Sequence, residues 1–287
     1  MSLNLLQIVV NGLLLGAIYA LFSSGLTLIW GMMNVINFAH GEFVMLGMFA
    51  AWLTQRYLGG GPLVVTLAAA VVLFLIGVVI YVTIIRDVMR GPMLAQILAT
   101  FGLALLLRYA VFWAFSPDVR TLQAGVLDHT LDLGGILIRL PRLVAGLVAG
   151  ALALGMHLLL TRTALGSRLL AVAEDRQAAM LMGIRPDRLQ ALAWGLAAAS
   201  AGIAGALMAT FFPFSPLTGE TYALTAFVVV TLGGFGSVPG AMLAGLVIGL
   251  IEQLSAYEIG PIYEDVVVYG LFVALLWFRP QGLLGKA

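Results

Sequence analysis

Residues 62–85 read PLVVTLAAAVVLFLIGVVIYVTII and contain no charged side chain. A helix needs about 20 mostly apolar residues to cross the hydrocarbon core of a bilayer, so this stretch predicts a membrane-spanning helix. The whole 287-residue chain has the same character, with 62% hydrophobic and 9% charged residues. Soluble domains are about 45–50% apolar and about a quarter charged. The composition therefore predicts a membrane protein and excludes a soluble enzyme, a nucleic-acid-binding protein and a disordered regulator.

Apolar segments recur along the chain, separated by short polar or glycine-rich stretches. They predict an all-α, polytopic integral membrane helix bundle, with some broken or re-entrant segments, in a single domain covering residues 1–287. Residues 1–4, MSLN, lack the basic region of a secretory signal, so we expect the first apolar segment to be retained. The candidate spans are residues 6–30, 40–57, 62–85, 93–115, 141–161, 189–212, 220–233, 237–254 and 263–279.

Basic residues are distributed unevenly between the two sets of loops. They are enriched in the cytoplasmic loops of membrane proteins. If Lys286 lies inside the cell, nine basic residues fall on the cytoplasmic side and four on the other, which predicts a cytoplasmic carboxyl terminus. If all nine segments cross, the amino terminus lies outside. The first group is Arg86, Arg90, Arg162, Arg168, Arg176, Arg185, Arg188, Arg279 and Lys286, and the second is Arg56, Arg120, Arg139 and Arg142.

The two longest connecting segments differ in charge. Residues 116–140 carry three aspartates and are expected outside, whereas residues 162–188 carry five arginines and are expected in the cytoplasm. Residues 166–183 mix apolar and charged side chains over a run of good helix formers that Gly183 and Pro186 end, which predicts one short amphipathic helix. This helix either lies on the membrane interface or its own bundle, or docks a cytoplasmic partner. The residues alone favour these alternatives equally.

Two stretches interrupt the apolar segments: residues 31–41 and the sequence GGFGSVPG at 233–240. Non-helical backbone at membrane depth survives only where it is buried in protein or lines a cavity. Interruptions in corresponding positions of two halves indicate a transport path. Residues 38–47 and 236–245 share a faint pattern that suggests a repeat.

The polar residues of the first interruption have two interpretations. Asn37 or His40 is expected to cap a helix that starts near Gly41, with Glu42 in its first turn, where the helix dipole favours an acid. Ionisable groups inside a membrane are also functional candidates by default. Capping and a role in a transport path are supported about equally by the residues.

Two further features concern helix packing and a buried charge. Small residues at four-residue spacing, such as the pairs Gly12/Gly16 and Gly245/Gly249 and the stripe from Ala197 to Ala209, allow helices to approach closely. Packing within one chain is favoured over a dimer face. Arg108 is the one basic residue inside a candidate span, and snorkelling toward the interface is favoured over pairing with a carboxylate in the path.

The sequence lacks residue types that enzyme chemistry and metal binding commonly need. The chain has no cysteine, and its three histidines are far apart in sequence, which argues against disulfides, iron–sulfur clusters and a metal site. An ATP-binding P-loop needs Gly-x-x-x-x-Gly-Lys-[Ser/Thr], and Lys286 is the only lysine. We therefore expect no catalytic residue and no cofactor, and the net charge of +1 gives no indication of a nucleic-acid partner.

Three motifs occur together in an order and spacing that a known family shares. They are NFAHGE at residues 37–42, AED at 173–175 followed by Gly183-Ile184, and GGFGSVPG at 233–240. With them the chain resembles the bacterial branched-chain amino-acid ABC permeases, specifically the LivH-type subunit, over nearly its whole length. Residues 177–183 also resemble the wider ABC-permease signature Glu-Ala-Ala-x-x-x-Gly, with Gln177 in place of the glutamate.

The resemblance implies that loop 162–188 forms a coupling helix in a groove of an ATPase. It also implies a location in the bacterial inner membrane and several partners: a second, related permease subunit in a heterodimer, two cytoplasmic ABC ATPase subunits, a periplasmic solute-binding protein and membrane lipid. The residues expected in ATPase coupling are Arg168, Glu174, Asp175, Ala178, Ala179 and Gly183. Those expected in the translocation path are Asn37, His40, Gly41, Glu42, Gly233, Gly234, Gly236 and Pro239.

The leading hypothesis is a permease subunit of a binding-protein-dependent ABC importer that moves branched-chain or related amino acids inward. One alternative is a secondary transporter with Glu42 as the titrating carboxyl. Proton relays generally use chains of acids and histidines, and this sequence offers about one clear intramembrane acid. The other alternative is a channel-like facilitator or a urea or amide permease of the same superfamily.

Overall fold

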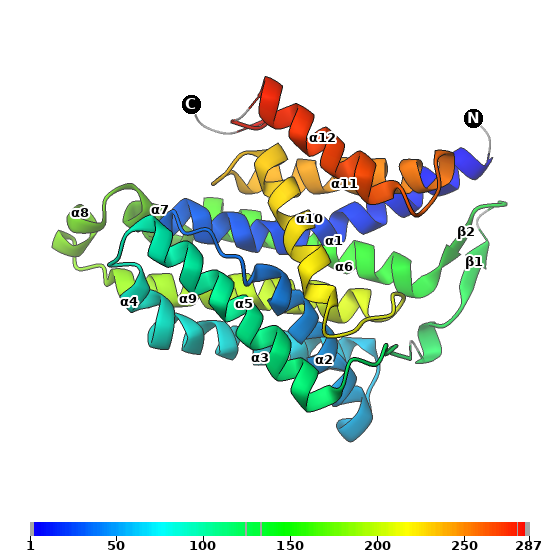
Figure 1. Cartoon of the computed structure of the whole chain (residues 1–287), viewed down its shortest axis with the longest axis horizontal. Coiled ribbons are helices and arrows are strands. Elements are labelled where there is room, and N and C mark those ends of the chain that lie inside the picture. Colours follow the sequence, from blue (N-terminus) through cyan, green and yellow to red (C-terminus); the bar gives the residue numbers. More distant parts are fainter. Residues whose placement is uncertain (1–2, 124, 133, 280, 285–287) are drawn as a thin grey trace.

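Long α-helices make up most of the structure (Figure 1). It is a computed structural model that describes residues 3–123, 125–132, 134–279 and 281–284. Each predicted span falls mainly in a helix, as expected for a helical membrane bundle. The helices are α1 (Leu3–Met33), α2 (His40–Leu58), α3 (Pro62–Ile80), α4 (Arg86–Val88), α5 (Met93–Phe115), α6 (Leu140–Arg162), α7 (Ala164–Glu174), α8 (Arg176–Leu181), α9 (Pro186–Met208), α10 (Thr218–Gly233), α11 (Val238–Glu258) and α12 (Glu264–Phe278).

The predicted spans divide into two groups by length and hydropathy. Six helical segments of the described chain are long and apolar enough to cross a membrane: Asn4–Met33, Pro62–Val88, Met93–Phe115, Leu140–Arg162, Pro186–Met208 and Val238–Glu258. The second of these joins α3 to α4 through a π-helical segment, Tyr81–Ile85. The other three predicted spans are α2, which is less apolar, and α10 and α12, which have only 16 and 15 residues. Two of these, α2 and α10, are the helices that adjoin the predicted interruptions.

Helix α9 lies in the middle of the bundle because its small residues let three neighbouring helices approach closely. Gly205 packs against Val44 of α2, and Gly202 packs against Leu73 of α3. Ala197 lies against Gly25 of α1. Where side chains are this small, backbones come into van der Waals contact, which favours helix association in lipid.

The same packing joins α1 to α11. Gly16 of α1 faces Gly245 of α11, and a methyl group on Gly16 would lie 2.7 Å from the carbonyl oxygen of Gly245. Gly12 of α1 likewise faces Gly249. The paired glycines therefore serve contacts within one chain, as the favoured interpretation predicts.

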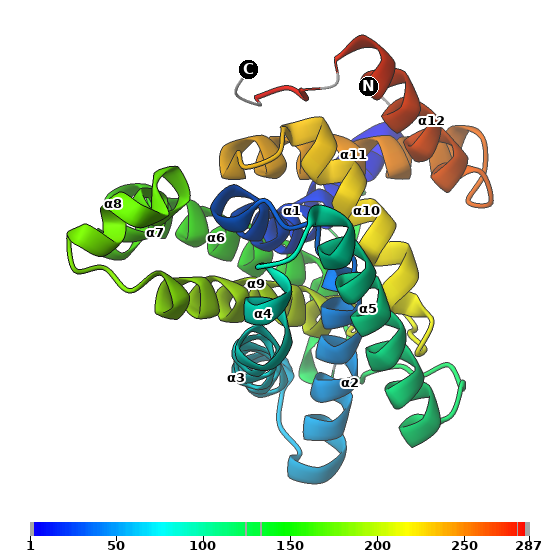
Figure 2. The same cartoon turned by 60° about the vertical axis from the view of Figure 1, so that its left-hand side comes forward.

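The two ends of the bundle differ in structure (Figures 1 and 2). Helices α4, α7 and α8 and the start of α9 lie at one end, here called the arginine-rich end. At the opposite end, the hairpin end, an antiparallel pair of strands, β1 (Thr130–Asp132) and β2 (Leu137–Arg139), extends from the bundle. These strands lie in the predicted loop 116–140 and were not predicted.

The described ends of the chain lie at opposite ends of the bundle (Figure 1). Helix α1 starts at the hairpin end. The amides of Leu283 and Leu284 donate hydrogen bonds to the carbonyl oxygens of Leu232 and Gly233, at 2.8 and 3.1 Å, which holds this segment at the arginine-rich end. This placement agrees with an odd number of crossings.

Helices α1–α3 and α9–α11 repeat one arrangement in opposite directions. α1 packs on α11, and α9 packs on α3. α2 and α10 pack together near their first turns and run from there to opposite ends of the bundle, α2 to the hairpin end and α10 to the arginine-rich end. This is the pattern of an inverted repeat. The faint repeat predicted from the sequence is wrong in its alignment, because the start of α2 corresponds to the start of α10 and not to residues 236–245.

Residues 166–183 form two helices, so the predicted single amphipathic helix is wrong. Asp175 adopts an extended backbone conformation (φ −149°, ψ 104°) and ends α7. Its carboxylate then accepts hydrogen bonds from the amides of Gln177 and Ala178, at 2.8 and 2.9 Å, and caps α8. An aspartate that bonds the second and third amides of a helix is a strong helix start, and this effect outweighs the helix-forming tendency of its neighbours. Gly183 (φ +78°) follows the end of α8, as predicted.

Candidate functional site

The first interruption returns the chain to the middle of the bundle. Asn34 leaves α1 with a positive φ of 51°, and the backbone then runs back along α1 to His40. There the imidazole Nε2 lies 2.8 Å from the carbonyl oxygen of Phe22, to which it donates a hydrogen bond. Phe22 lies about 16 Å from the end of α1 at about 1.5 Å per residue. Helix α2 therefore begins well inside the bundle.

The two residues expected to cap α2, Asn37 and His40, are buried, but neither caps the helix. Ala39 is the N-cap residue and makes no side-chain capping bond. Asn37 accepts a hydrogen bond from the amide of Ala39 at 3.1 Å, and so orders the turn before the helix. Asn37, His40 and Glu42 are all completely buried, and Glu42 lies in the first turn as predicted.

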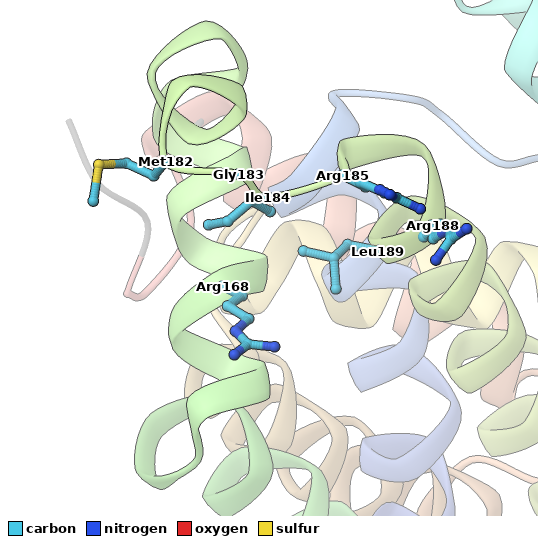
Figure 3. A pocket seen from close by; sticks show the side chains of 7 residues that line it. All are labelled: Arg168, Met182, Gly183, Ile184, Arg185, Arg188 and Leu189. Carbon is cyan, nitrogen blue, oxygen red and sulfur yellow. The ribbon is translucent and has the colours of Figure 1, made fainter.

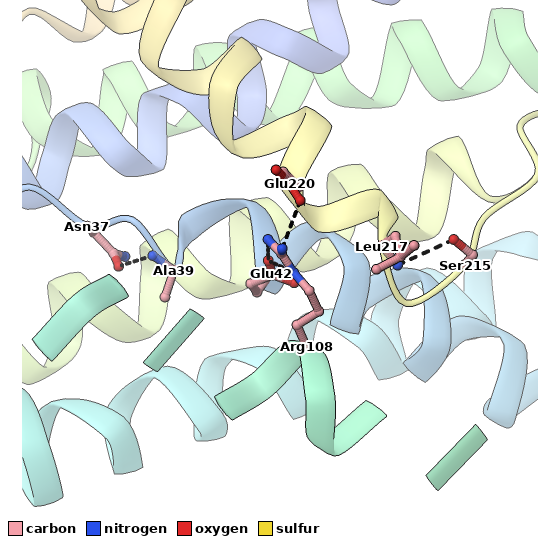
Figure 4. Close-up of polar contacts among 7 residues, drawn as sticks. All are labelled: Asn37, Ala39, Glu42, Arg108, Ser215, Leu217 and Glu220. Carbon is pink, nitrogen blue, oxygen red and sulfur yellow. Dashed lines mark hydrogen bonds and ion pairs between the residues drawn. The ribbon is translucent and has the colours of Figure 1, made fainter. Parts of the chain in front are cut away.

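Glu42 pairs with Arg108 of α5 (Figure 4). The Nε and Nη2 atoms of Arg108 donate to Oε1 of Glu42, at 3.0 and 2.6 Å. The third contact is made by Nη1, which donates to Oε2 of Glu220 at 2.8 Å. The prediction that Arg108 snorkels is wrong, and the alternative of pairing with a carboxylate is correct. A buried carboxylate needs a compensating charge, and Arg108 is the basic residue that α5 brings to it.

The three members of this Glu42–Arg108–Glu220 triad differ in exposure. The side chains of Glu42 and Arg108 are 1% and 14% exposed, whereas that of Glu220 is 64% exposed. Glu220 was not predicted as a site residue. Its signal in the sequence is the tripeptide Thr-Gly-Glu at 218–220, which matches His-Gly-Glu at 40–42. Each tripeptide forms the start of its helix and places its acid in the first turn.

Glycines at the second position of these two helices let α2 and α10 touch. A methyl group on Gly41 would collide with the backbone of Gly219 and Ala223. A methyl group on Gly219 would collide with the carboxylate of Glu42. Because neither glycine has a side chain, both first turns and their acids reach the same guanidinium. We call this region the helix junction.

The second interruption lies elsewhere, at the arginine-rich end. Gly234 and Gly236 have positive φ values of 96° and 80°, which favour glycine. Ser237 caps α11 by accepting a hydrogen bond from the amide of Gly240 at 3.2 Å. Along α10, Gly233 lies about 20 Å from Glu220. The structure therefore does not bring Gly233, Gly234, Gly236 and Pro239 together with Asn37, His40, Gly41 and Glu42.

The second interruption contacts the end of α1, where the first interruption starts. Gly31 packs against Gly236, and the rings of Trp30 and Phe235 are 4.6 Å apart. A groove of about 450 Å³ runs between these two segments and α7. Its lining residues include Asn34, Pro239 and Glu174, so the end of α7 borders both interruptions.

Helices α7 and α8 cover their own bundle on one side and expose apolar residues on the other. Leu169, Val172 and Ala179 are buried against a cluster that includes Leu28 of α1 and Ala193 of α9. In contrast, Leu181 and Met182, at the tip of α8, are 88% and 82% exposed. Both alternatives for this segment therefore have a structural basis, packing on the bundle for one face and a free apolar tip for the other.

The residues predicted for ATPase coupling lie on or beside these helices. Arg168 belongs to α7, Ala178 and buried Ala179 belong to α8, and Gly183 follows it. A shallow pocket of about 330 Å³ lies between α7 and the start of α9 (Figure 3). Three arginines and the end of the loop line it: Arg168, Met182, Gly183, Ile184, Arg185, Arg188 and Leu189. The pocket is thus lined by three cationic side chains and by apolar ones, next to the exposed tip of α8.

A comparison with protein families gives one match that spans most of the chain. Residues 8–276 match the family described as the branched-chain amino acid transport system / permease component. The chain belongs to this family. Membership makes it a multi-pass membrane permease subunit and not an enzyme.

Individual relatives of this permease agree with the family match. It is 32% identical to the high-affinity branched-chain amino acid transport system permease protein BraD of Pseudomonas aeruginosa, over 98% of this chain and 96% of that one. It is 33% identical to permease protein LivH of Escherichia coli K12, over 99% of this chain and 96% of LivH. Permease protein LivM of the same strain is 28% identical, over 93% of this chain and 68% of LivM.

Among solved structures, the permease resembles PsaBC from Streptococcus pneumoniae in complex with Fab. The TM-score is 0.53 at 12% sequence identity, over 94% of this chain and 91% of that one. At this identity the match supports the fold and nothing beyond it.

Proposed function

We propose that this chain is one of two membrane subunits of an ATP-driven importer for branched-chain amino acids, in a bacterial inner membrane. The relatives BraD and LivH, whose names include this substrate class, support the proposal because they match nearly the full length of the chain. The single lysine, Lys286, excludes a P-loop in this sequence, so ATP hydrolysis has to come from separate subunits. In this arrangement the arginine-rich end and the carboxyl terminus face the cytoplasm.

The observation that carries the proposal is the position of α7 and α8. Their inner face packs on α1 and α9, and the end of α7 borders the groove between both interruptions. Their outer tip, Leu181 and Met182, is exposed beside an arginine-lined pocket. A partner that binds this tip and moves α7 would therefore act on both interruptions at once. We assign this binding to the ATPase subunits. The residues that form the docking segment are Arg168, Glu174, Asp175, Ala178, Ala179 and Gly183.

The helix junction supports a second permease subunit on one face. Glu220 lies near the middle of the bundle and exposes 64% of its side chain. Charged side chains at this depth avoid lipid and face protein or a water-filled path. We therefore place a second, related permease against the face formed by α2, α5 and α10, with the translocation path between the two subunits. The LivH and LivM proteins of E. coli, both similar to this chain, support such a heterodimer.

The proposed path has two levels. Asn37, His40, Gly41 and Glu42 belong to the helix junction at mid-depth, and Gly233, Gly234, Gly236 and Pro239 belong to the inner end. The periplasmic solute-binding protein would then deliver solute at the hairpin end. Movement of α7 would open and close the inner end of the path by changing the contact between Gly31 and Gly236.

The test is uptake of L-leucine by the complete transporter in proteoliposomes, with ATP inside and the solute-binding protein outside. Leu181→Asp places a charge on the exposed tip, so we expect ATPase activity without uptake and an unchanged melting temperature. Leu181→Met is the matched control, because it keeps an apolar side chain at the same exposed position and should leave uptake at the wild-type level. Ala179→Arg is a poorer test, since Ala179 is buried and the arginine would disturb the packing of α8.

Three outcomes would contradict the proposal. Normal uptake by Leu181→Asp would remove the docking role of the tip. Uptake by this chain alone under an imposed proton or sodium gradient would favour a secondary transporter. Transport of urea or a small amide, with no uptake of leucine by the wild type, would favour the amide permeases of the superfamily.

A further inference from the structure

We propose that Arg108 and Glu220 form a binding site for the two charged groups of a zwitterionic amino acid on its way through the membrane. The site deepens the proposed function and rests on it. It commits the permease itself to recognising the charged backbone of the solute. Its evidence is the division of contacts within the triad, an unsatisfied oxygen at the helix junction, and an apolar cluster beside it.

The guanidinium of Arg108 divides its hydrogen bonds between a fixed partner and an exchangeable one. Nε and Nη2 both bond Oε1 of Glu42, a side chain that is 1% exposed. Nη1 bonds Glu220, whose side chain is 64% exposed. Glu42 thus neutralises Arg108 permanently, whereas Glu220 can turn away into the path without exposing a buried charge.

This exchangeable pair is complementary to a zwitterion. A solute carboxylate would take the position of the Glu220 carboxylate on Nη1, and the released Glu220 would bind the solute ammonium group. One internal ion pair is then replaced by two pairs with the solute. Because no charge is left without a partner at mid-depth, the exchange avoids the free energy of desolvating an isolated ion.

One further acceptor at the junction has no partner. Oε2 of Glu42 is buried and makes no hydrogen bond to any residue that the structure describes. It faces Gly219, the neighbour of Glu220, with no side chain between them. A solute ammonium group has three donors, and Glu220 alone does not use them all. The unsatisfied oxygen thus lies on the side of the site where the ammonium group is expected.

An apolar cluster continues the site toward the arginine-rich end. One turn from the triad stand the small residues Ala104 on α5 and Ala223 on α10. About 10 Å from the triad, two turns away on the same helices, stand Phe101 and Phe227. Both pack around Phe38 of the first interruption, with ring centroids 6.4 and 5.1 Å apart. Charged groups followed by small residues and then aromatic rings suit an amino acid with an apolar side chain.

The test measures binding to the assembled transporter, with both permeases and the ATPases in lipid nanodiscs and without the solute-binding protein. The three probes are L-leucine, 4-methylpentanoate, which lacks the ammonium group, and 3-methylbutylamine, which lacks the carboxylate. For the wild type we expect each single-charge probe to bind at least about tenfold more weakly than leucine, the loss that one ion pair produces. Glu220→Gln should abolish the preference for leucine over 4-methylpentanoate.

Two further variants separate binding from folding. Glu258→Gln is the matched control, since Glu258 is an exposed acid at the far end of α11, and its probe preferences should equal those of the wild type. The double variant Arg108→Gln/Glu42→Gln removes a buried pair without leaving one charge behind. It should abolish the preference for leucine over 3-methylbutylamine.

The results distinguish this site from the proposed function. If the complete wild-type transporter takes up leucine but Glu220→Gln keeps both the wild-type probe preferences and the wild-type KM for uptake, the binding site is refuted and the proposed function stands. If the wild type does not take up leucine, the proposed function fails first. Equal binding of all three probes to the wild type would also refute the site.

Discussion

Helices α2 and α10 begin alike but use their acids differently. Each has Gly-Glu at its second and third positions, and each directs its carboxylate to the guanidinium of Arg108. Yet the Glu42 side chain is 1% exposed and that of Glu220 is 64% exposed. The reason lies in the neighbours, because α2 is enclosed by α3, α9 and α10. The comparison teaches that one repeated motif can supply both a structural counter-ion and an accessible site.

The largest expected effect comes from removing the cation that both acids share. Arg108→Gln leaves Glu42 buried without a compensating charge, and breaking a buried pair in this way costs about 3–5 kcal/mol. We expect the purified variant to unfold at a clearly lower temperature in detergent. The double variant Arg108→Gln/Glu42→Gln should regain part of this loss. A single variant as stable as the wild type would show that Glu42 does not depend on Arg108.

The next largest effect is the difference in stability lost when Glu42 or Glu220 is replaced. Glu42→Gln removes a buried, doubly bonded carboxylate and should lower the free energy of unfolding by about 1–3 kcal/mol. Glu220→Gln removes an exposed partner, and exposed ion pairs contribute about 0–1 kcal/mol. Chemical denaturation of both variants in the same detergent measures the difference. Equal losses would mean that Glu220 is buried to the same degree as Glu42.

A smaller contrast concerns the two glycines. In Gly41→Ala the new methyl group meets the backbone of α10, which cannot turn aside, so we expect a loss of about 1–3 kcal/mol. In Gly219→Ala it meets Oε2 of Glu42, a side-chain oxygen that makes no hydrogen bond to any described residue and can shift, so the loss in stability should be smaller. Melting curves of the two variants test this order. The reverse order would contradict the helix contact described here.

Several elements of the fold and site were predictable because they depend on local composition. Residues 62–85 carry no charge and are almost all apolar, so a helix, which satisfies its backbone hydrogen bonds within the segment, suits lipid. Glu42 was placed in the first turn of a helix, and Gly183 was placed at a helix end, from motifs a few residues long. The groups of basic residues at 86–90 and 162–188 were placed on one side of the membrane, and the structure brings both to one end of the bundle.

Other elements were not predictable because distant segments determine them. Nothing near Arg108 in the sequence shows that α5 will meet the first turns of α2 and α10, so the snorkelling alternative was favoured wrongly. Glu220 is not predictable from its own surroundings, because its tripeptide is informative only beside residues 40–42. The break at Asp175 is not predictable from the sequence, because an aspartate that caps a helix and one inside a helix have the same neighbours in the chain.

The amino-acid sequence by itself determined that this protein is embedded in a bilayer and that it carries no P-loop. It also determined the ends of most membrane-spanning helices to within a few residues. These properties follow from hydropathy and short-range backbone chemistry, which act between neighbours in the chain. Only the tertiary structure decided that Glu42 is enclosed and Glu220 is open, and that two interruptions lie at different depths. Burial and charge pairing depend on which helices pack together, and small residues scattered over the whole chain control that packing.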